Sequence, residues 1–83
     1  MQLTIKTTGL LGRHLPEGSD RNRGTVELAD GSTARDLLTT LAIPDDGRCY
    51  VSVNDAMLRA EELDVTVLTE SDKIILMAPI TAG

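Results

Sequence analysis

The sequence predicts a single α+β domain in which one helix packs on one face of a sheet of four or five strands. Segments that alternate apolar and polar residues, as half-buried strands do, occur in both halves of the chain. Between them lies one segment whose apolar spacing is that of a helix with one buried face. The chain has 83 residues, of which 41% are hydrophobic, so it can bury one modest core.

The first two strands are predicted from alternation in residues 1–6 and 25–29. Residues 8–23 between them contain several glycines and a proline, so we expect a long irregular connection, with at most a short turn at Leu10–Leu11. The two strands are then expected to pair as an antiparallel hairpin. Their predicted inward-facing residues are Leu3, Ile5, Val26 and Leu28.

The helix is the clearest local signal. Thr33 followed by Asp36 resembles a capping box, although Glu or Gln is the usual partner. We expect a helix of about ten residues that ends before Pro44, because the residue that precedes a proline disfavours helical geometry. Its buried stripe consists of Ala34, Leu37, Leu38 and Leu41.

A third strand is predicted in residues 49–53, followed by a turn at Asn54–Asp55 and a short strand at Met57–Leu58. The turn lacks the glycine of the strongest hairpin signal. Residues of the third strand that share one face are Cys49, Val51 and Val53.

The last strand is predicted in residues 73–77, after a turn at residues 70–72. Residues 62–68 before it are ambiguous between a strand and irregular structure. In the last strand Ile74 and Leu76 face the core, and Ile75 and Met77 face the other side of the sheet, part of which must contact water.

Composition limits the partners. The net charge is −5, and Tyr50 is the only aromatic residue, so a nucleic-acid partner or an anionic membrane surface is not expected. The N-terminal segment has no signal-peptide pattern and no apolar run approaches a membrane span, so we expect a cytoplasmic protein. Residues 45–72 hold eight acids against two arginines, which indicates either a solvated surface or a docking surface for a basic partner.

Groups that usually build active sites are mostly missing. Cys49 is the single cysteine, which excludes an intrachain disulfide and a thiolate metal cluster and favours a small buried hydrophobe. His14 lies in a polar loop, where we expect a surface side chain, and Lys73 is expected to face solvent. Neither a phosphate-binding glycine motif nor a metal-ligand spacing is present. We therefore predict no metal site, no bound cofactor and no catalytic activity of the chain alone.

Residues 1–77 are predicted to form the domain and residues 78–83 a flexible C-terminal tail. Small residues at Thr81, Ala82 and Gly83 would let the backbone enter a narrow catalytic pocket of another protein, and glycine has no Cβ to block attack at its carbonyl carbon. From composition alone the tail is either a loose end or a functional end.

Three segments carry a resemblance to a known family: TVELADGSTARDLLTTLAIP (25–44), YVSVN (50–54) and LTESDKIILMAPITAG (68–83). Together they resemble the MoaD and ThiS family of β-grasp, ubiquitin-like sulfur carriers. The resemblance covers nearly the whole chain and lies closer to MoaD, the small subunit of molybdopterin synthase, because of the loop LLGRHLPEG and of Pro79 after the last strand. It implies a mixed sheet with one main helix.

Two positions depart from the family pattern. The tail ends Ala82-Gly83 where the family has Gly-Gly, and the acidic turn reads Ser71-Asp72 where a glycine usually precedes the aspartate. The final residue, which carries the chemistry in the family, is still glycine.

The resemblance implies a role in molybdenum-cofactor or thiamine-type biosynthesis. A ubiquitin-activating-type adenylyltransferase would use ATP to adenylate the Gly83 carboxylate, and a sulfur donor would convert it to a thiocarboxylate. An acceptor such as the molybdopterin synthase large subunit would then receive the sulfur. Expected partner contacts are Ile75 and Met77, with Ile80 in the tail. The other tail residues assigned to the site are Pro79, Thr81 and Ala82.

Two alternatives share this fold. The chain would act as a ubiquitin-like modifier if Gly83 formed isopeptide bonds with lysines of target proteins. It would be a β-grasp binding module without carrier chemistry if Ala82 prevented activation of the terminus.

Overall fold

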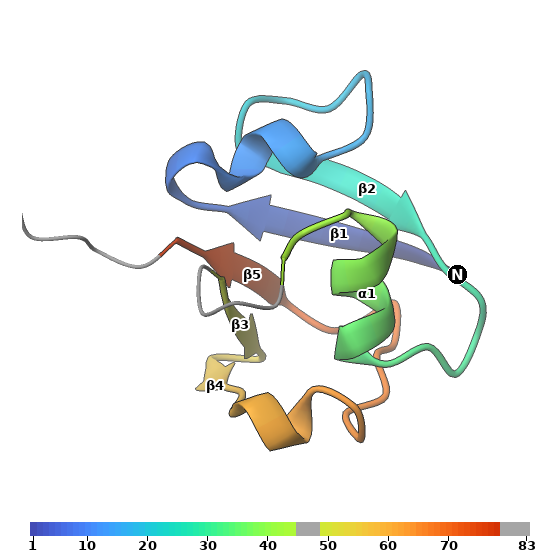
Figure 1. Cartoon of the computed structure of the whole chain (residues 1–83). Coiled ribbons are helices and arrows are strands. Elements are labelled where there is room, and N and C mark those ends of the chain that lie inside the picture. Colours follow the sequence, from blue (N-terminus) through green and yellow to red (C-terminus); the bar gives the residue numbers. More distant parts are fainter. Residues whose placement is uncertain (45–48, 79–83) are drawn as a thin grey trace, which may run out of the picture.

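In the part of the chain that the structure describes, five strands form one mixed sheet, and one α-helix packs across one of its faces (Figure 1). The structure is a computed structural model that describes residues 1–44 and 49–78. Its elements are β1 (Gln2–Thr7), the 3₁₀ helix η1 (Gly9–His14), β2 (Arg23–Glu27), α1 (Ala34–Thr40), β3 (Tyr50–Val53), β4 (Ala56–Met57), the 3₁₀ helix η2 (Ala60–Glu62) and β5 (Ile74–Met77).

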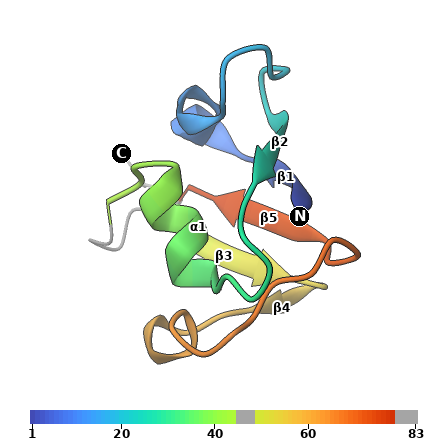
Figure 2. The ribbon, with the colours of Figure 1, turned by 90° about the vertical axis from the view of Figure 1, so that its right-hand side faces the viewer.

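The strand order is β2-β1-β5-β3-β4, so the last strand of the chain is the middle strand of the sheet. β1 and β2 form the predicted antiparallel pair. β5 runs parallel to β1 and antiparallel to β3. Figure 2 shows α1 on one side of this sheet, and no helix of the described residues covers the opposite side. The prediction of an α+β sheet with one main helix is confirmed.

The core lies between α1 and the inner face of the sheet. Every residue predicted to face inward from β1, β2 and β5, and the whole predicted stripe of the helix, is buried. Leu11 and Leu15 join this core from the connection that we expected to be irregular. That expectation is wrong in part: Gly9–His14 form η1, whose buried Leu11 ties the connection to the sheet.

The helix is shorter than predicted and ends for a different reason. The capping box of Thr33 and Asp36 is present as expected. However, α1 covers only Ala34–Thr40. It ends before the region that Pro44 restricts, because Ala42 adopts a left-handed φ of 56°. The N–H of Ala42 donates to the carbonyl of Thr39, and that of Ile43 to Leu38, which is a Schellman termination.

Replacing Ala42 with glycine is expected to stabilise the domain by about 1 kcal/mol, because alanine pays a steric penalty at positive φ that glycine avoids. In thermal unfolding this corresponds to a rise in Tm of about 4–8 °C for a domain of this size. Ala29→Gly, at an exposed position without positive φ, is the matched control and is expected to lower Tm slightly. Equal shifts for both variants would contradict the proposed strain.

Two predictions for the second half of the chain concern the turn at Asn54–Asp55 and the ambiguous residues 62–68. Asn54 and Asp55 both adopt positive φ, 53° and 70°, between the paired residues Val53 and Ala56, so the predicted turn is a two-residue hairpin of type I′ geometry. Within the ambiguous residues 62–68 the structure has no strand: Val67 makes only an isolated bridge to Thr33.

Candidate functional site

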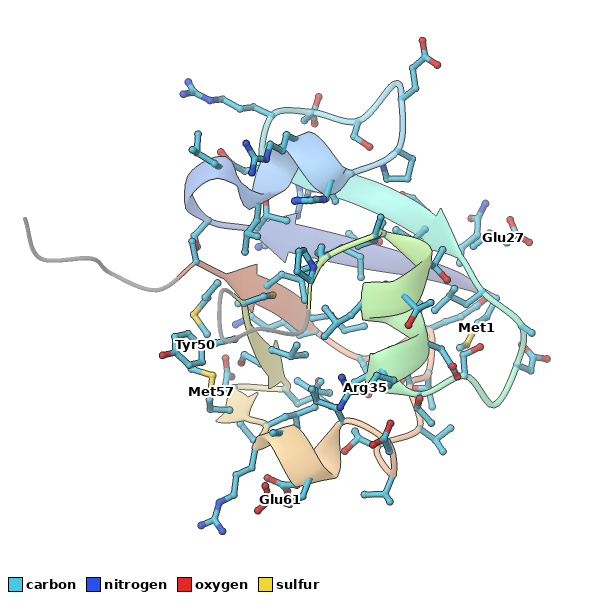
Figure 3. All side chains as sticks on the ribbon, viewed as in Figure 1. Met1, Glu27, Arg35, Tyr50, Met57 and Glu61 are labelled. Carbon is cyan, nitrogen blue, oxygen red and sulfur yellow. The ribbon has the colours of Figure 1, made fainter. Side chains whose placement is uncertain are left out.

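The outer face of the sheet, opposite α1, carries an apolar patch at the end of β5. Ile75 and Met77 lie on this face and are half-buried, as their alternation predicts. Strand register places Tyr50 opposite Met77, and Ser52 between Ile75 and Met57. Tyr50 and Met57 are 46% and 53% exposed, and Figure 3 shows their side chains next to each other. We call Tyr50, Met57, Ile75 and Met77 the outer patch.

Two cations border the outer patch on the side of β1 and β2. In the same register row, Lys6 pairs with Ile75 and with Arg23. Both cationic side chains are exposed. This acidic protein therefore presents an apolar surface with a basic margin, and that combination fits a partner surface with an apolar centre and acidic residues beside it.

The structure places the start of the predicted tail beside the outer patch. Met77, the last residue of β5, belongs to the patch, and the half-buried Ala78 follows it. Gly83 and the predicted tail residues Pro79, Ile80, Thr81 and Ala82 lie outside the described residues. Their roles, the roles of Ile75 and Met77, and the division between domain and tail at residue 77 stay predictions.

Asn54 and Asp72, which lie in two different segments of the family resemblance, form a hydrogen bond that stabilises the fold. The Nδ2 of Asn54 donates to the Asp72 carboxylate at 2.9 Å, and the N–H of Lys73 donates to the Asn54 Oδ1 at 2.9 Å. Asp72 also accepts from the N–H of Thr69 at 2.8 Å. The β3–β4 turn is thereby joined to the turn that precedes β5. Nothing in the local pattern of either turn indicates this pairing.

The hydrogen bond from Asn54 keeps the pKa of Asp72 below its ordinary value of 3.8, and the hydrogen bonds from Thr69 act in the same direction. Because the folded-state pKa is depressed, this contribution to stability is present above about pH 4 and is lost as the pH falls through the folded value. Asp72→Asn is therefore expected to be less stable than the wild type at pH 7, with a difference that shrinks below pH 4. Urea unfolding of both proteins at a series of pH values measures this difference in the free energy of unfolding.

Ser71→Ala, a change in the same exposed turn that keeps the Asp72 carboxylate and removes no titratable group, is the control. Its stability difference from the wild type should stay nearly constant over the same pH range. A difference for Asp72→Asn that is also independent of pH would contradict the role of the carboxylate.

The remaining candidate groups occupy structural positions. Cys49 is half-buried against the core, and burial raises its pKa to about 11, so the thiol is protonated at neutral pH and is a poor nucleophile. Lys73 is exposed, as predicted, and its Nζ lies 3.0 Å from the Asp55 carboxylate. His14 is half-buried at the end of η1, so the expected surface position is only partly correct.

Within residues 1–44 and 49–78, no group of three His, Cys, Asp or Glu side chains is arranged to hold a metal ion. Likewise, none of the helices in this part of the chain is long and apolar enough to cross a membrane. The cytoplasmic location stays a prediction.

Solved structures with the same fold include three small proteins. ThiS from Geobacter metallireducens matches with a TM-score of 0.62 at 17% identity, over 98% of this chain and 100% of that one. SAMP1 from Haloferax volcanii matches with a TM-score of 0.70 at 20% identity, over the full length of both chains. A chain of the complex of subunits 1 and 2 of molybdopterin-converting factor from Helicobacter pylori matches with a TM-score of 0.61 at 19% identity, over the full length of both chains.

At these identities the structures show the fold alone, so the preference for the MoaD type over the ThiS type stays a prediction. The search of curated protein sequences found no match. The model of the ThiS family, by contrast, matches residues 17–83, which is most of the chain. With the order of strands and helix described above, this match establishes that the chain belongs to the ThiS family of sulfur carriers with the ubiquitin-like β-grasp fold.

Proposed function

We propose that this chain is a sulfur carrier in which Gly83 is adenylated by a partner enzyme and converted to a thiocarboxylate for cofactor biosynthesis. The observation that carries the proposal is the position of β5. This strand lies in the middle of the sheet, contributes Ile75 and Met77 to the outer patch, and ends where the tail begins. A partner that binds the patch is therefore positioned to receive the residues that follow.

The reach of the tail agrees with this arrangement. From Ala78 to Gly83 a fully extended chain spans at most about 20 Å, which is enough to cross from a docking surface into a buried catalytic pocket. The folded domain supplies binding and orientation, and the partner supplies the chemistry. The carrier is therefore not an enzyme by itself.

The chemistry proceeds in two stages. A Gly83 carboxylate oxygen attacks the α-phosphate of ATP, and pyrophosphate leaves, which gives an acyl-adenylate. The terminal sulfur of a persulfide donor then attacks the carbonyl carbon, AMP leaves, and a second thiol cleaves the S–S bond to release the thiocarboxylate. Glycine favours the attack of the persulfide sulfur because no Cβ crowds the carbonyl carbon.

We infer an acceptor enzyme of the large-subunit type as the last partner. The molybdopterin-converting factor of Helicobacter pylori, which shares this fold, forms a complex of its subunits 1 and 2. The outer patch with its basic margin at Lys6 and Arg23 is the surface we assign to the activating and accepting partners in turn.

The test is to incubate the chain with candidate adenylyltransferases, ATP and a persulfide donor, and to weigh the product. We expect a gain of about 16 Da, the replacement of one oxygen by sulfur. A variant that lacks Gly83 is the control and should show no gain, and Ala82→Gly measures what the departure from the family pattern costs. No gain with any candidate enzyme would contradict the proposal, and ladders of heavier conjugates would favour the modifier alternative.

A further inference from the structure

Ala78, the last described residue, is hydrogen-bonded to Thr8 at the corner of the chain between β1 and η1. The N–H of Thr8 donates to the carbonyl of Leu76 at 3.0 Å, which continues the parallel β1–β5 pairing by one residue. The N–H of Ala78 donates to the hydroxyl oxygen of Thr8 at 2.9 Å. The hydrogen bonding of β5 to β1 is therefore extended to Ala78 by the side chain of Thr8.

A side-chain oxygen acts as the acceptor here, and the backbone carbonyl of Thr8 is engaged in η1 instead. In a regular parallel ladder the N–H of Ala78 would donate to the carbonyl of Thr8. That carbonyl instead accepts from the N–H of Leu11 at 3.3 Å, in the first turn of η1. The Thr8 hydroxyl thus replaces a backbone acceptor that the start of the 3₁₀ helix has removed.

Gly9 lets the corner close around the departing chain. It has a φ of +58°, and a Cβ at this position would lie 3.0 Å from the Cβ of Ala78. The chain can therefore turn away from β1 into η1 while Ala78 stays packed beside it, against the core.

We propose that Thr8 is a positioning residue for the C-terminal segment. It fixes Ala78, and with it the point from which residues 79–83 begin, relative to the outer patch. Five residues then remain to span the distance to the partner's catalytic centre, at most about 17 Å when extended. Without this hydrogen bond the starting point lies earlier in the chain, and the partner must order more residues each time it binds. The consequence for charging rests on the function proposed above.

Thr8→Val keeps the shape of the side chain and removes the acceptor. We expect the KM of the activating enzyme for the carrier to rise about tenfold, because additional backbone is ordered on binding, while kcat stays nearly unchanged. Thr8→Ser keeps a hydroxyl and is expected to restore the wild-type KM. Thr25→Val, the same replacement at an exposed position of β2, is the matched control and should leave KM unchanged.

A second measurement needs no partner. In NMR relaxation, the order parameter of the Ala78 amide is expected to lie near 0.85 in the wild type, in Thr8→Ser and in Thr25→Val, and to fall below about 0.6 in Thr8→Val. An Ala78 amide that stays ordered in Thr8→Val overturns the positioning role, and so does an unchanged KM. If no enzyme charges the wild type, the proposed function fails, and the order parameter alone decides the role of Thr8.

Discussion

The double variant Ile75→Ala/Met77→Ala is expected to raise the KM of the activating enzyme for the carrier about 100-fold, because two apolar anchors of the interface are truncated. A fully buried side chain of this size contributes about 1.5–3 kcal/mol. Both residues are already half-buried in the free protein, so we assign each about 1.4 kcal/mol of binding free energy. Steady-state pyrophosphate exchange at varied carrier concentrations measures the change.

The control for this variant is Val65→Ala. Val65 is 73% exposed in the connection between η2 and β5, outside the outer patch, and its truncation removes a comparable apolar group. Its KM should equal that of the wild type. If the double variant is charged as well as the wild type while removal of Gly83 abolishes charging, the partner recognises the tail alone and the outer patch has no role in docking.

Gly12→Ala is expected to destabilise the domain by about 3 kcal/mol, the largest effect on folding that we predict for a single methyl group. A Cβ at Gly12 would lie 1.9 Å from the carbonyl oxygen of Arg21, so the backbone itself has to move. That movement pulls η1, and with it the buried Leu11, away from the sheet. In thermal unfolding the expected loss corresponds to a fall in Tm of roughly 12–24 °C.

Glu17→Ala is the control for this prediction, because it places an alanine at an exposed position of the same connection. It should change the free energy of unfolding by less than about 0.5 kcal/mol. If Gly12→Ala unfolds at the wild-type temperature, the connection between β1 and β2 can rearrange freely and does not contribute to the core as described.

Local patterns determined much of the fold. The four apolar positions of the helix repeat with the period of an α-helix, and all four are buried. Alternation in the strands likewise separated Ile74 and Leu76 in the core from Ile75 and Met77 on the outer face. These features follow from the sequence because periodicity decides which side chains share one face of an element, whatever the element packs against.

Two features that the local patterns did not predict, η1 and the link between two turns, depend on contacts between distant segments. Leu11 and Leu15 looked like isolated apolar residues in a loop, and only packing against the sheet explains η1. The end of the helix has a local cause: α1 ends at Thr40 because the N–H groups of Ala42 and Ile43 satisfy carbonyls of its last turn, before Pro44 is reached. The hydrogen bond between Asn54 and Asp72 joins two turns that are 18 residues apart.

The sequence by itself determined an α+β domain with one amphipathic helix, the residues of its inner face, and a resemblance that the match to the ThiS family bears out. Only the tertiary structure decided that β5 lies beside β1, which brings Ala78 to Thr8 across 70 positions of the chain, and that Tyr50 and Met57 complete a patch with Ile75 and Met77. The physical reason is that hydrophobic periodicity depends only on residues within one element. Strand order depends instead on which apolar faces, distant in the sequence, can be buried together.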